Sequence, residues 1–417
     1  MLSNKTISLL LLSLVAFIDV MGIGLVYPMF ASMLFQGDCQ LLDPNVSDTT
    51  RGTCLGILLA AMPITQFFSA PILGMLSDQR GRKKIITLGL FIGVLGYIVA
   101  MVAVSLENFA LLLLSRVIIG ISAGTAAVVS AALADISSPE EKSKNFGFLN
   151  MSFGLGFTVG PFLGGILSSS SFFMIEKYAV PFFMSAVVCL LNLLLVMKFF
   201  SETFEPKKIE KLSLTQGIKN IKRAFVMPGL QAVFLSVFLA CVGWSFYWEF
   251  TPVTWISQFG FSTAEIGNFY AYGAAVYALS CGLLIRPIVG RFPNHYVLFY
   301  ALIGLSVTIG ILLFHDHEFW LWIYIPLQQF TIALFWPTAA AVVSNAVSED
   351  IQGEILGVFQ SVDSLAFAIS PLVAGPLLGI SSMMPIIVGS SAVCCAAGVL
   401  GLFLKKVPIY QKASNPS

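Results

Sequence analysis

The chain has 417 residues, of which 57% are hydrophobic and only 10% are charged. Charged residues make up about 25% of a typical soluble domain, so this composition excludes a soluble protein and indicates an integral membrane protein. The formal net charge of +1 excludes the strongly basic surface that nucleic-acid binding requires.

The apolar segments predict an all-α integral membrane fold with twelve transmembrane helices, since each span needs about 20 residues. The first segment is too long to be the apolar part of a cleavable signal peptide. We place the spans at residues 7–34, 53–76, 84–105, 108–134, 143–168, 176–200, 230–257, 264–285, 296–314, 319–346, 353–379 and 383–404.

One long polar connection, residues 201–228, lies near the middle of the chain and predicts a cytoplasmic linker. It would join two pseudo-symmetric six-helix halves, residues 1–200 and 229–417, the second of which ends in a short cytoplasmic tail. Part of the linker, residues 214–225, has apolar residues at helical spacing and is predicted to lie on the membrane surface.

The positions of the basic residues predict the orientation. With the N-terminus in the cytoplasm, all of the 22 Lys and Arg residues except Arg51, Arg116 and Lys177 lie on the cytoplasmic side. Cytoplasmic loops of membrane proteins carry such an excess of Lys and Arg. We therefore expect both termini in the cytoplasm.

The first span contains Asp19, and the fourth contains Arg116. An Arg side chain does not lose its proton, so Arg116 needs an acidic partner or water inside the bilayer. Counting about 1.5 Å per residue along each helix puts Asp19 and Arg116 at similar depths, which predicts a pair. The alternative is that Arg116 extends outward and Asp19 faces a water-filled entrance.

A charged stretch between the second and third spans, residues 74–84, is called the charged loop below. It must lie in water or among lipid headgroups, because a charge at the bilayer centre costs several kcal/mol. Its spacing, Gly74-x3-Asp78-x2-Gly81-Arg82-Lys83, closely resembles the loop between helices 2 and 3 of the major facilitator superfamily. Gln79 departs from this resemblance, because the superfamily usually has a basic residue there.

The resemblance implies a gate on the cytoplasmic side. In the superfamily the second Arg of this loop, here Arg82, pairs with a residue at the end of helix 4, here Asp135. The loop acid, here Asp78, is implied to contact the start of the helix near Gln352. The alternative is that these charges are merely solvated. The implied gate residues are Gly74, Asp78, Gly81, Arg82, Lys83 and Asp135.

The fifth span contains the string Gly156-Phe-Thr-Val-Gly160-Pro161-Phe-Leu-Gly164-Gly165. Glycines four apart place small residues on one helical face and permit close helix contact, so a packing role is the simpler interpretation. The string also resembles the Gly-x3-Gly-Pro-x2-Gly-Gly signature of proton-coupled antiporters in the superfamily. This resemblance favours export by antiport over import or uniport.

Two further acids lie in the second half, Glu249 in the seventh span and Asp363 near the middle of the eleventh. An acid inside a membrane is by default a candidate functional residue. The alternative for Glu249 is that it merely lies at the membrane interface. The string Arg116-x3-Gly120 resembles the fourth-helix motif of the superfamily, in which the Arg takes part in proton coupling. The predicted coupling residues are Asp19, Arg116, Asp363 and Glu249.

Polar and aromatic side chains within the spans are candidates for substrate contact. Hydrogen bonds between helices and aromatic belts at the membrane surface are the alternatives. Cys39 and Cys54 flank the outward loop, where they form a disulfide only if that side is oxidising; the sequence leaves this open. The predicted substrate-cavity residues are Tyr27, Gln66, Asn150, Tyr247, Trp248 and Trp336.

The string from Phe17 to Pro28 resembles helix 1 of the tetracycline-resistance branch of drug:proton antiporters. The resemblance implies a secondary transporter that exchanges a small organic solute for protons by alternating access, in a bacterial inner membrane. A proton-coupled importer of an amino acid or an iron chelate is the main alternative, and a non-transporting receptor is a second.

The expected partners are a small-molecule substrate, protons and the lipid bilayer, with no nucleic acid, and we expect a monomer. We expect no cofactor and no metal. The sequence contains no phosphate-binding loop of the Gly-x4-Gly-Lys type and no histidine beside a nucleophile, so an enzyme is not predicted.

Overall fold

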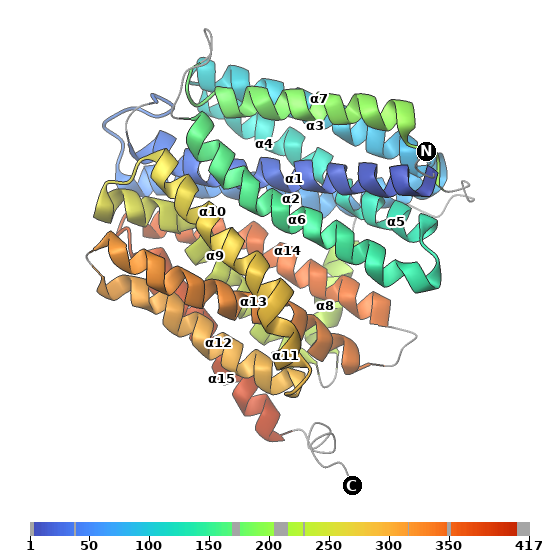
Figure 1. The fold of residues 1–417 in the computed structure, drawn as a ribbon. Helices are drawn as coiled ribbons and strands as arrows, with labels where there is room; N and C mark the ends of the chain where they lie inside the picture. The colour runs from blue at the N-terminus through green and yellow to red at the C-terminus, as the bar shows by residue number, and fades with distance from the viewer. Residues whose placement is uncertain are drawn as a thin grey trace. The chain divides into compact units, whose positions relative to one another are not determined.

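The computed structural model describes residues 4–36, 39–168, 176–203, 216–227, 230–315, 317–347 and 352–406. Within these ranges every regular element is helical (Figure 1), as predicted. Ten helical stretches of the described residues are long and apolar enough to cross a membrane, and Met151–Leu167 is a shorter apolar helix. The protein is therefore a multi-pass integral membrane protein.

The helices follow the predicted spans closely. The first group is α1 (Asn4–Phe35), α2 (Asp48–Arg80), α3 (Arg82–Ser105), α4 (Phe109–Ala123), α5 (Ala126–Ile136), α6 (Pro139–Leu167) and α7 (Val180–Phe199). The linker helix α8 (Gln216–Val226) is followed by α9 (Gln231–Phe259), α10 (Thr263–Leu279), a π-helical turn (Ser280–Leu284), α11 (Ile285–Val289), α12 (Asn294–Ile311), α13 (Leu321–Asn345), α14 (Gln352–Leu377) and α15 (Met384–Lys406). Short 3-10 turns, Leu312–Phe314 and Glu318–Trp320, lie between α12 and α13.

Two predicted spans are interrupted. The predicted span 264–285 contains the π-helical turn, and the predicted span 108–134 breaks between α4 and α5. At the second break, a Cβ on Gly124 would lie 2.9 Å from the backbone nitrogen of Ala70, so α2 passes very close. Side chains of α2 donate to α4 there, Gln66 Nε2 to the Ala123 carbonyl at 3.3 Å and Ser69 Oγ to the Gly120 carbonyl at 3.1 Å.

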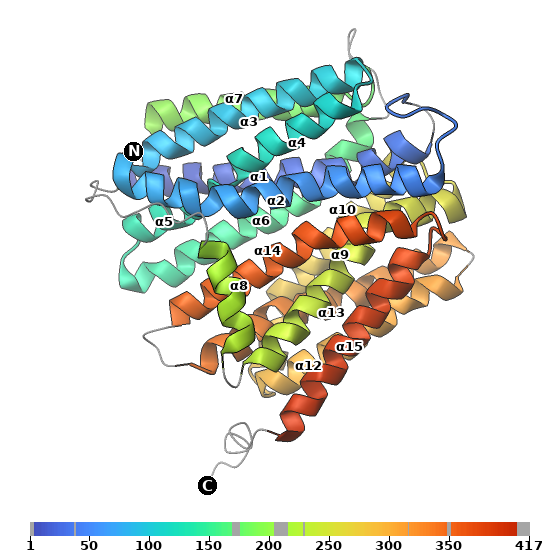
Figure 2. The ribbon, with the colours of Figure 1, turned by 180° about the vertical axis from the view of Figure 1, so that it is seen from behind.

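The chain forms two compact units. Unit 1 comprises Met1–Ser47, Ile57–Gln216 and Gly260–Tyr272; unit 2 comprises Asp48–Gly56, Gly217–Phe259 and Gly273–Ser417. In unit 1, α1 packs against α6 and α7, and α3 packs against α4 and α7. In unit 2, α9 packs against α14 and α15, and α12 packs against α13 and α15 (Figure 2).

The two faces of α3 show why such helices suit a membrane. Its inward face is lined by buried glycines, and Ser122 Oγ of α4 donates to the Gly89 carbonyl at 2.7 Å. Its other face presents Leu88, Phe91, Leu95 and Ile98, each between 41% and 51% exposed. A contiguous exposed apolar stripe is unfavourable in water but favourable against lipid.

Candidate functional site

The charged loop reverses the chain within a single residue. α2 ends at Arg80, α3 begins at Arg82, and Gly81 between them has φ 91° and ψ 148°. This left-handed conformation is accessible to glycine at little cost, which explains the glycine at this predicted gate position. For Gly74, an added Cβ would have no neighbour within 4 Å, so close packing does not explain that glycine.

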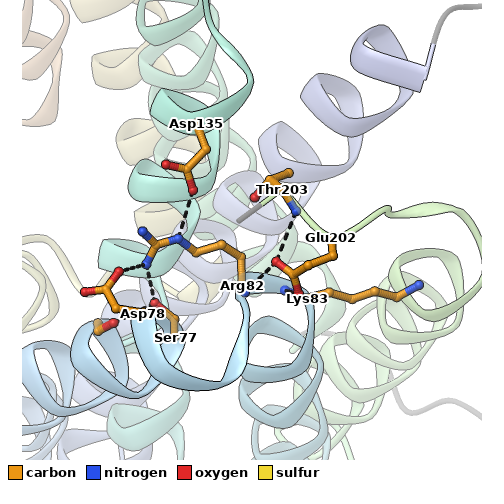
Figure 3. A network of polar contacts seen from close by, with 8 residues as sticks. Ser77, Asp78, Arg82, Lys83, Asp135, Glu202 and Thr203 are labelled. Carbon is orange, nitrogen blue, oxygen red and sulfur yellow. Dashed lines mark hydrogen bonds and ion pairs between the residues drawn. The ribbon is translucent and has the colours of Figure 1, made fainter. Parts of the chain in front are cut away.

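Arg82 lies at the centre of a buried polar network (Figure 3). Its side chain is only 6% exposed and makes ion pairs from NH1 to Asp78 Oδ1 at 2.6 Å and from Nε to Asp135 Oδ2 at 3.0 Å. NH1 also donates to Ser77 Oγ at 2.5 Å. The structure thus brings Arg82 and Asp135 together, while contact between Asp78 and the helix starting near Gln352 stays a prediction.

Glu202, which the sequence analysis missed, completes this network. One carboxylate oxygen accepts from the backbone N–H of Arg82 at 2.8 Å, and the other accepts from that of Lys83 at 3.1 Å. A carboxylate at a helix N-terminus interacts favourably with the free N–H groups and the helix dipole. A signal was present in the sequence: α3 opens with three basic residues and no acid, so its N-terminus needs an acceptor from elsewhere.

Asp19 and Arg116 lie within unit 1 beside Tyr97. Both charged side chains are close enough to the Tyr97 phenol to interact with it electrostatically, and Tyr97 from α3 fills the space over Gly22, one turn after Asp19. Asp19 Oδ2 is buried with no hydrogen-bond partner among the described residues.

Arg116 is only 2% exposed, so it does not extend outward to the membrane surface. Its NH2 donates to Met62 Sδ at 3.2 Å, and its guanidinium lies 5.4 Å from the centroid of the Phe30 ring. Direct pairing of Arg116 with Asp19 stays a prediction. Tyr97 was not singled out from the sequence, because a tyrosine in an apolar span carries no signal of its neighbours.

The glycines of α6 form the predicted packing face. A Cβ on Gly156 would lie 2.7 Å from the Phe17 carbonyl oxygen, and one on Gly160 would lie 2.5 Å from that of Met21. A Cβ on Gly164 would overlap the Leu25 carbonyl. The three glycines, each one turn apart, therefore let the backbone of α6 touch the backbone of α1 on either side of Asp19.

Pro161 and Gly165 belong to other contacts of α6. Pro161 packs on Gly24 of α1, where an added Cβ would lie 2.8 Å from Pro161 Cδ. Gly165 faces α10, where its added Cβ would lie 3.0 Å from the Cα of Gly267. The antiporter-like string thus joins α6 to α1 and to α10 within unit 1.

The acids of unit 2 lie in α9 and α14, whose sequences contain no Lys or Arg. Asp363 Oδ2 accepts a hydrogen bond from Gln360 Nε2 at 3.1 Å, and its Oδ1 has no partner among the described residues. Glu249 is 2% exposed, and its depth relative to the membrane interface stays a prediction. Its Oε2 also has no hydrogen-bond partner in the described part of the chain.

The predicted substrate residues have mixed surroundings. Gln66 is tied to α4 through Ala123, which supports the alternative of a hydrogen bond between helices. Trp248 is half-buried and stacks on Trp244 with ring centroids 5.5 Å apart, while Tyr247 is buried. Trp336 is half-buried beside Phe335. The side chains of Tyr27 and Asn150 lie outside what the structure describes.

Cys39 and Cys54, which flank the predicted outward loop, are both free thiols, so the possible disulfide between them is not formed in the structure. Burial raises the pKa of the Cys39 thiol to about 11, with the carboxylates of Glu107 and Glu176 adding to the shift. Cys39 is therefore protonated and poorly reactive at neutral pH.

The chemistry that the described residues offer lies in their buried carboxyl groups. Among the described residues, no group of three or more His, Cys, Asp or Glu side chains has the proximity that a metal site needs. The buried acids Asp19, Glu249 and Asp363 each have one oxygen without a hydrogen-bond partner in the part of the chain that the structure describes. Such a carboxyl can carry a proton through an apolar environment.

Known proteins resemble this chain over most of its length. The family described as Major Facilitator Superfamily matches residues 9–307 and 233–417. The chain is 27% identical over 382 residues to Tetracycline resistance protein, class H, of Pasteurella multocida, covering 88% of each chain. It is 26% identical over 418 residues to Multidrug resistance protein 1 of Bacillus subtilis, covering 99% of each.

The fold has solved counterparts as well. The crystal structure of D-xylose-proton symporter aligns with a TM-score of 0.78 at 15% identity, over 96% of this chain and 98% of that one. The human organic anion transporter MFSD10 aligns with a TM-score of 0.69 at 20% identity, over 96% of this chain and 100% of that one. At these identities the likeness establishes the fold alone.

Proposed function

This chain belongs to the major facilitator superfamily, and we propose that it exports a small organic compound in exchange for protons by alternating access. It is a membrane transporter and not an enzyme. Relatives named for tetracycline resistance and multidrug resistance, aligned over most of their length, support export of a drug or metabolite.

The observation that carries proton coupling is the buried site around Asp19 in unit 1. A permanently charged Arg116 is held away from water, and Asp19 has an oxygen without a hydrogen-bond partner among the described residues. Such groups are costly to retain in a membrane without ion traffic. When Asp19 releases its proton, the carboxylate can be stabilised by the nearby positive charge. Movement of Arg116 relative to Asp19 would then alternate proton uptake with release.

The network around Arg82 supports a gate on the cytoplasmic side. Two carboxylates and one hydroxyl hold the guanidinium, and charge-assisted bonds of this kind are about twice as strong as neutral ones. In the proposed cycle this network forms in one state and loosens in the other. The proposal places both termini in the cytoplasm and the protein in a bacterial inner membrane, with halves 1–200 and 229–417 joined by the linker 201–228.

Flux measurements with the purified protein in liposomes test this function. Tetracyclines, other drugs, amino acids and iron chelates would be offered in turn, with an imposed pH gradient and with the gradient collapsed by an ionophore. We expect transport of one compound, driven against its gradient by protons moving the opposite way. Co-transport of compound and protons in the same direction would instead favour the importer, and flux indifferent to the ionophore would refute proton coupling.

A further inference from the structure

The N-terminus of α3 has no acceptor within its own sequence. Its N-cap residue is Gly81, which makes no side-chain cap, and no acid occurs in the first helical turn. That turn instead carries Arg82, Lys83 and Lys84. Positive side chains next to the positive end of a helix dipole are unfavourable, so a negative charge placed at the backbone N–H groups of this helix start is stabilising.

Glu202 supplies that charge from just beyond the last turn of α7. Both of its carboxylate oxygens are used, with backbone donors Arg82 at 2.8 Å and Lys83 at 3.1 Å, and Thr203 N–H adds a bond at 3.0 Å. A Cβ at position 81 would overlap the same carboxylate. Gly81 therefore meets two requirements at once, its positive φ and the close approach of Glu202 (Figure 3).

We propose that Glu202 is a positioning residue of the transporter, which holds the backbone of Arg82 so that its guanidinium reaches Asp78 and Asp135. This inference rests on the gate described under the proposed function. Arg82 is then fixed at both ends, by Glu202 at its backbone nitrogen and by the carboxylates at its side chain. Loss of Glu202 frees the helix start and lets the guanidinium leave its partners.

Hydrogen exchange of the purified protein tests the contact without any need for transport. In Glu202→Gln we expect the amides of Arg82 and Lys83 to exchange at least about fivefold faster than in the wild type, the factor that loss of a helix cap produces. Glu107→Gln is the matched control, because Glu107 is also exposed and also accepts a backbone N–H, that of Gln40 at 2.8 Å. Unchanged exchange at Arg82 and Lys83 in Glu202→Gln would overturn the inference.

A double-mutant cycle tests whether Glu202 acts through Arg82. We expect Glu202→Gln to lower the transport kcat about fivefold with KM unchanged, and to cause no further loss in the Arg82→Ala background, because contacting residues are not additive. Equal losses in both backgrounds would show a structural effect only and refute the positioning role. Should Glu202→Gln fail to fold, Glu202→Asp, which keeps the charge but shortens the reach, is expected to give an intermediate exchange rate.

Failure of this inference can be distinguished from failure of the proposed function. A wild-type protein that moves no compound under either gradient would contradict export, while the exchange measurement would still decide whether Glu202 caps α3. A wild type that transports normally, with Glu202→Gln indistinguishable from Glu107→Gln in both readouts, would contradict the inference and leave export intact.

Discussion

The two units hold a membrane-embedded acid in different ways. In unit 1, Asp19 lies near the permanent charge of Arg116, with Tyr97 close to both. In unit 2, Asp363 is bonded by the neutral amide of Gln360, and the sequences of α9, α13 and α14 contain no Lys or Arg. Under the function proposed above, the same residue type would have two tasks: Asp19 would respond to a moving charge, and Asp363 would bind its proton without one.

Neutralising the acids is expected to have the largest effect. Asp19→Asn and Asp363→Asn should each lower pH-driven transport about 1,000-fold, within the range that loss of a proton-transferring group produces. Exchange of substrate without a pH gradient should survive, because asparagine keeps the size of the side chain. Liposome flux with and without the gradient measures both. Full pH-driven flux in Asp363→Asn alone would show that Asp363 is not the proton carrier of unit 2. Glu249→Gln would then be tested in its place.

Removing the permanent charge tests the difference between the units directly. Arg116→Gln should lower the free energy of unfolding by about 3 kcal/mol, because an acid nearby loses a compensating charge. The same change should cost much less in the Asp19→Asn background and should cost the full amount in the Asp363→Asn background. Thermal unfolding in detergent provides the measurement. Equal costs in all three backgrounds would show that Arg116 does not act on Asp19.

The glycines beside Asp19 give a smaller effect. Gly156→Ala should destabilise the protein by about 2 kcal/mol, because overpacking a close contact costs this much, and its Cβ would lie 2.7 Å from the Phe17 carbonyl oxygen. Gly154→Ala in the same helix and Gly357→Ala in α14 are matched controls, since an added Cβ at either has no neighbour within 4 Å. A loss of stability in Gly357→Ala as large as in Gly156→Ala would show that the close contact with α1 is not the cause.

The smallest effect is expected in unit 2. Gln360→Leu removes the neutral donor to Asp363, and a hydrogen bond of this kind contributes about 1 kcal/mol, so transport should fall about fivefold. Ser364→Ala is the control, because that hydroxyl donates only to the Gln360 backbone carbonyl at 2.8 Å. Initial rates of pH-driven flux report the result. A loss of 100-fold or more would mean that Asp363 depends on its neighbour as strongly as a charged pair would.

Much of the fold follows from patterns within the sequence. The apolar spans and the charged loop predict the helices, since burying charge or exposing backbone in lipid is so costly. The glycine spacing of α6 predicts a close helix contact, and the structure has one with α1. The prediction that Arg82 pairs with Asp135 came from the family resemblance, because nothing in the local sequence of either residue indicates its partner.

Other features depend on tertiary contacts that no local pattern encodes. Glu202 lies 120 positions from Arg82, so only the fold brings them together. The break between α4 and α5 arises where α2 approaches the backbone at Gly124. A glycine in an apolar helix does not by itself predict such a break. Tyr97 became visible as a neighbour of Asp19 and Arg116 only once α1, α3 and α4 were packed.

The glycine face of α6 has a consequence for motion. Gly156, Gly160 and Gly164 contact α1 at Phe17, Met21 and Leu25, so the two helices share a repeat of four residues, about one turn or 6 Å of rise. At these three glycines no side chain of α6 separates the two backbones, so no rotamer entropy of up to about 2 kcal/mol per side chain opposes a shift there. A displacement of α1 by one turn along α6 would place Met21 opposite Gly156 and Leu25 opposite Gly160, and would change the depth of Asp19 by one turn.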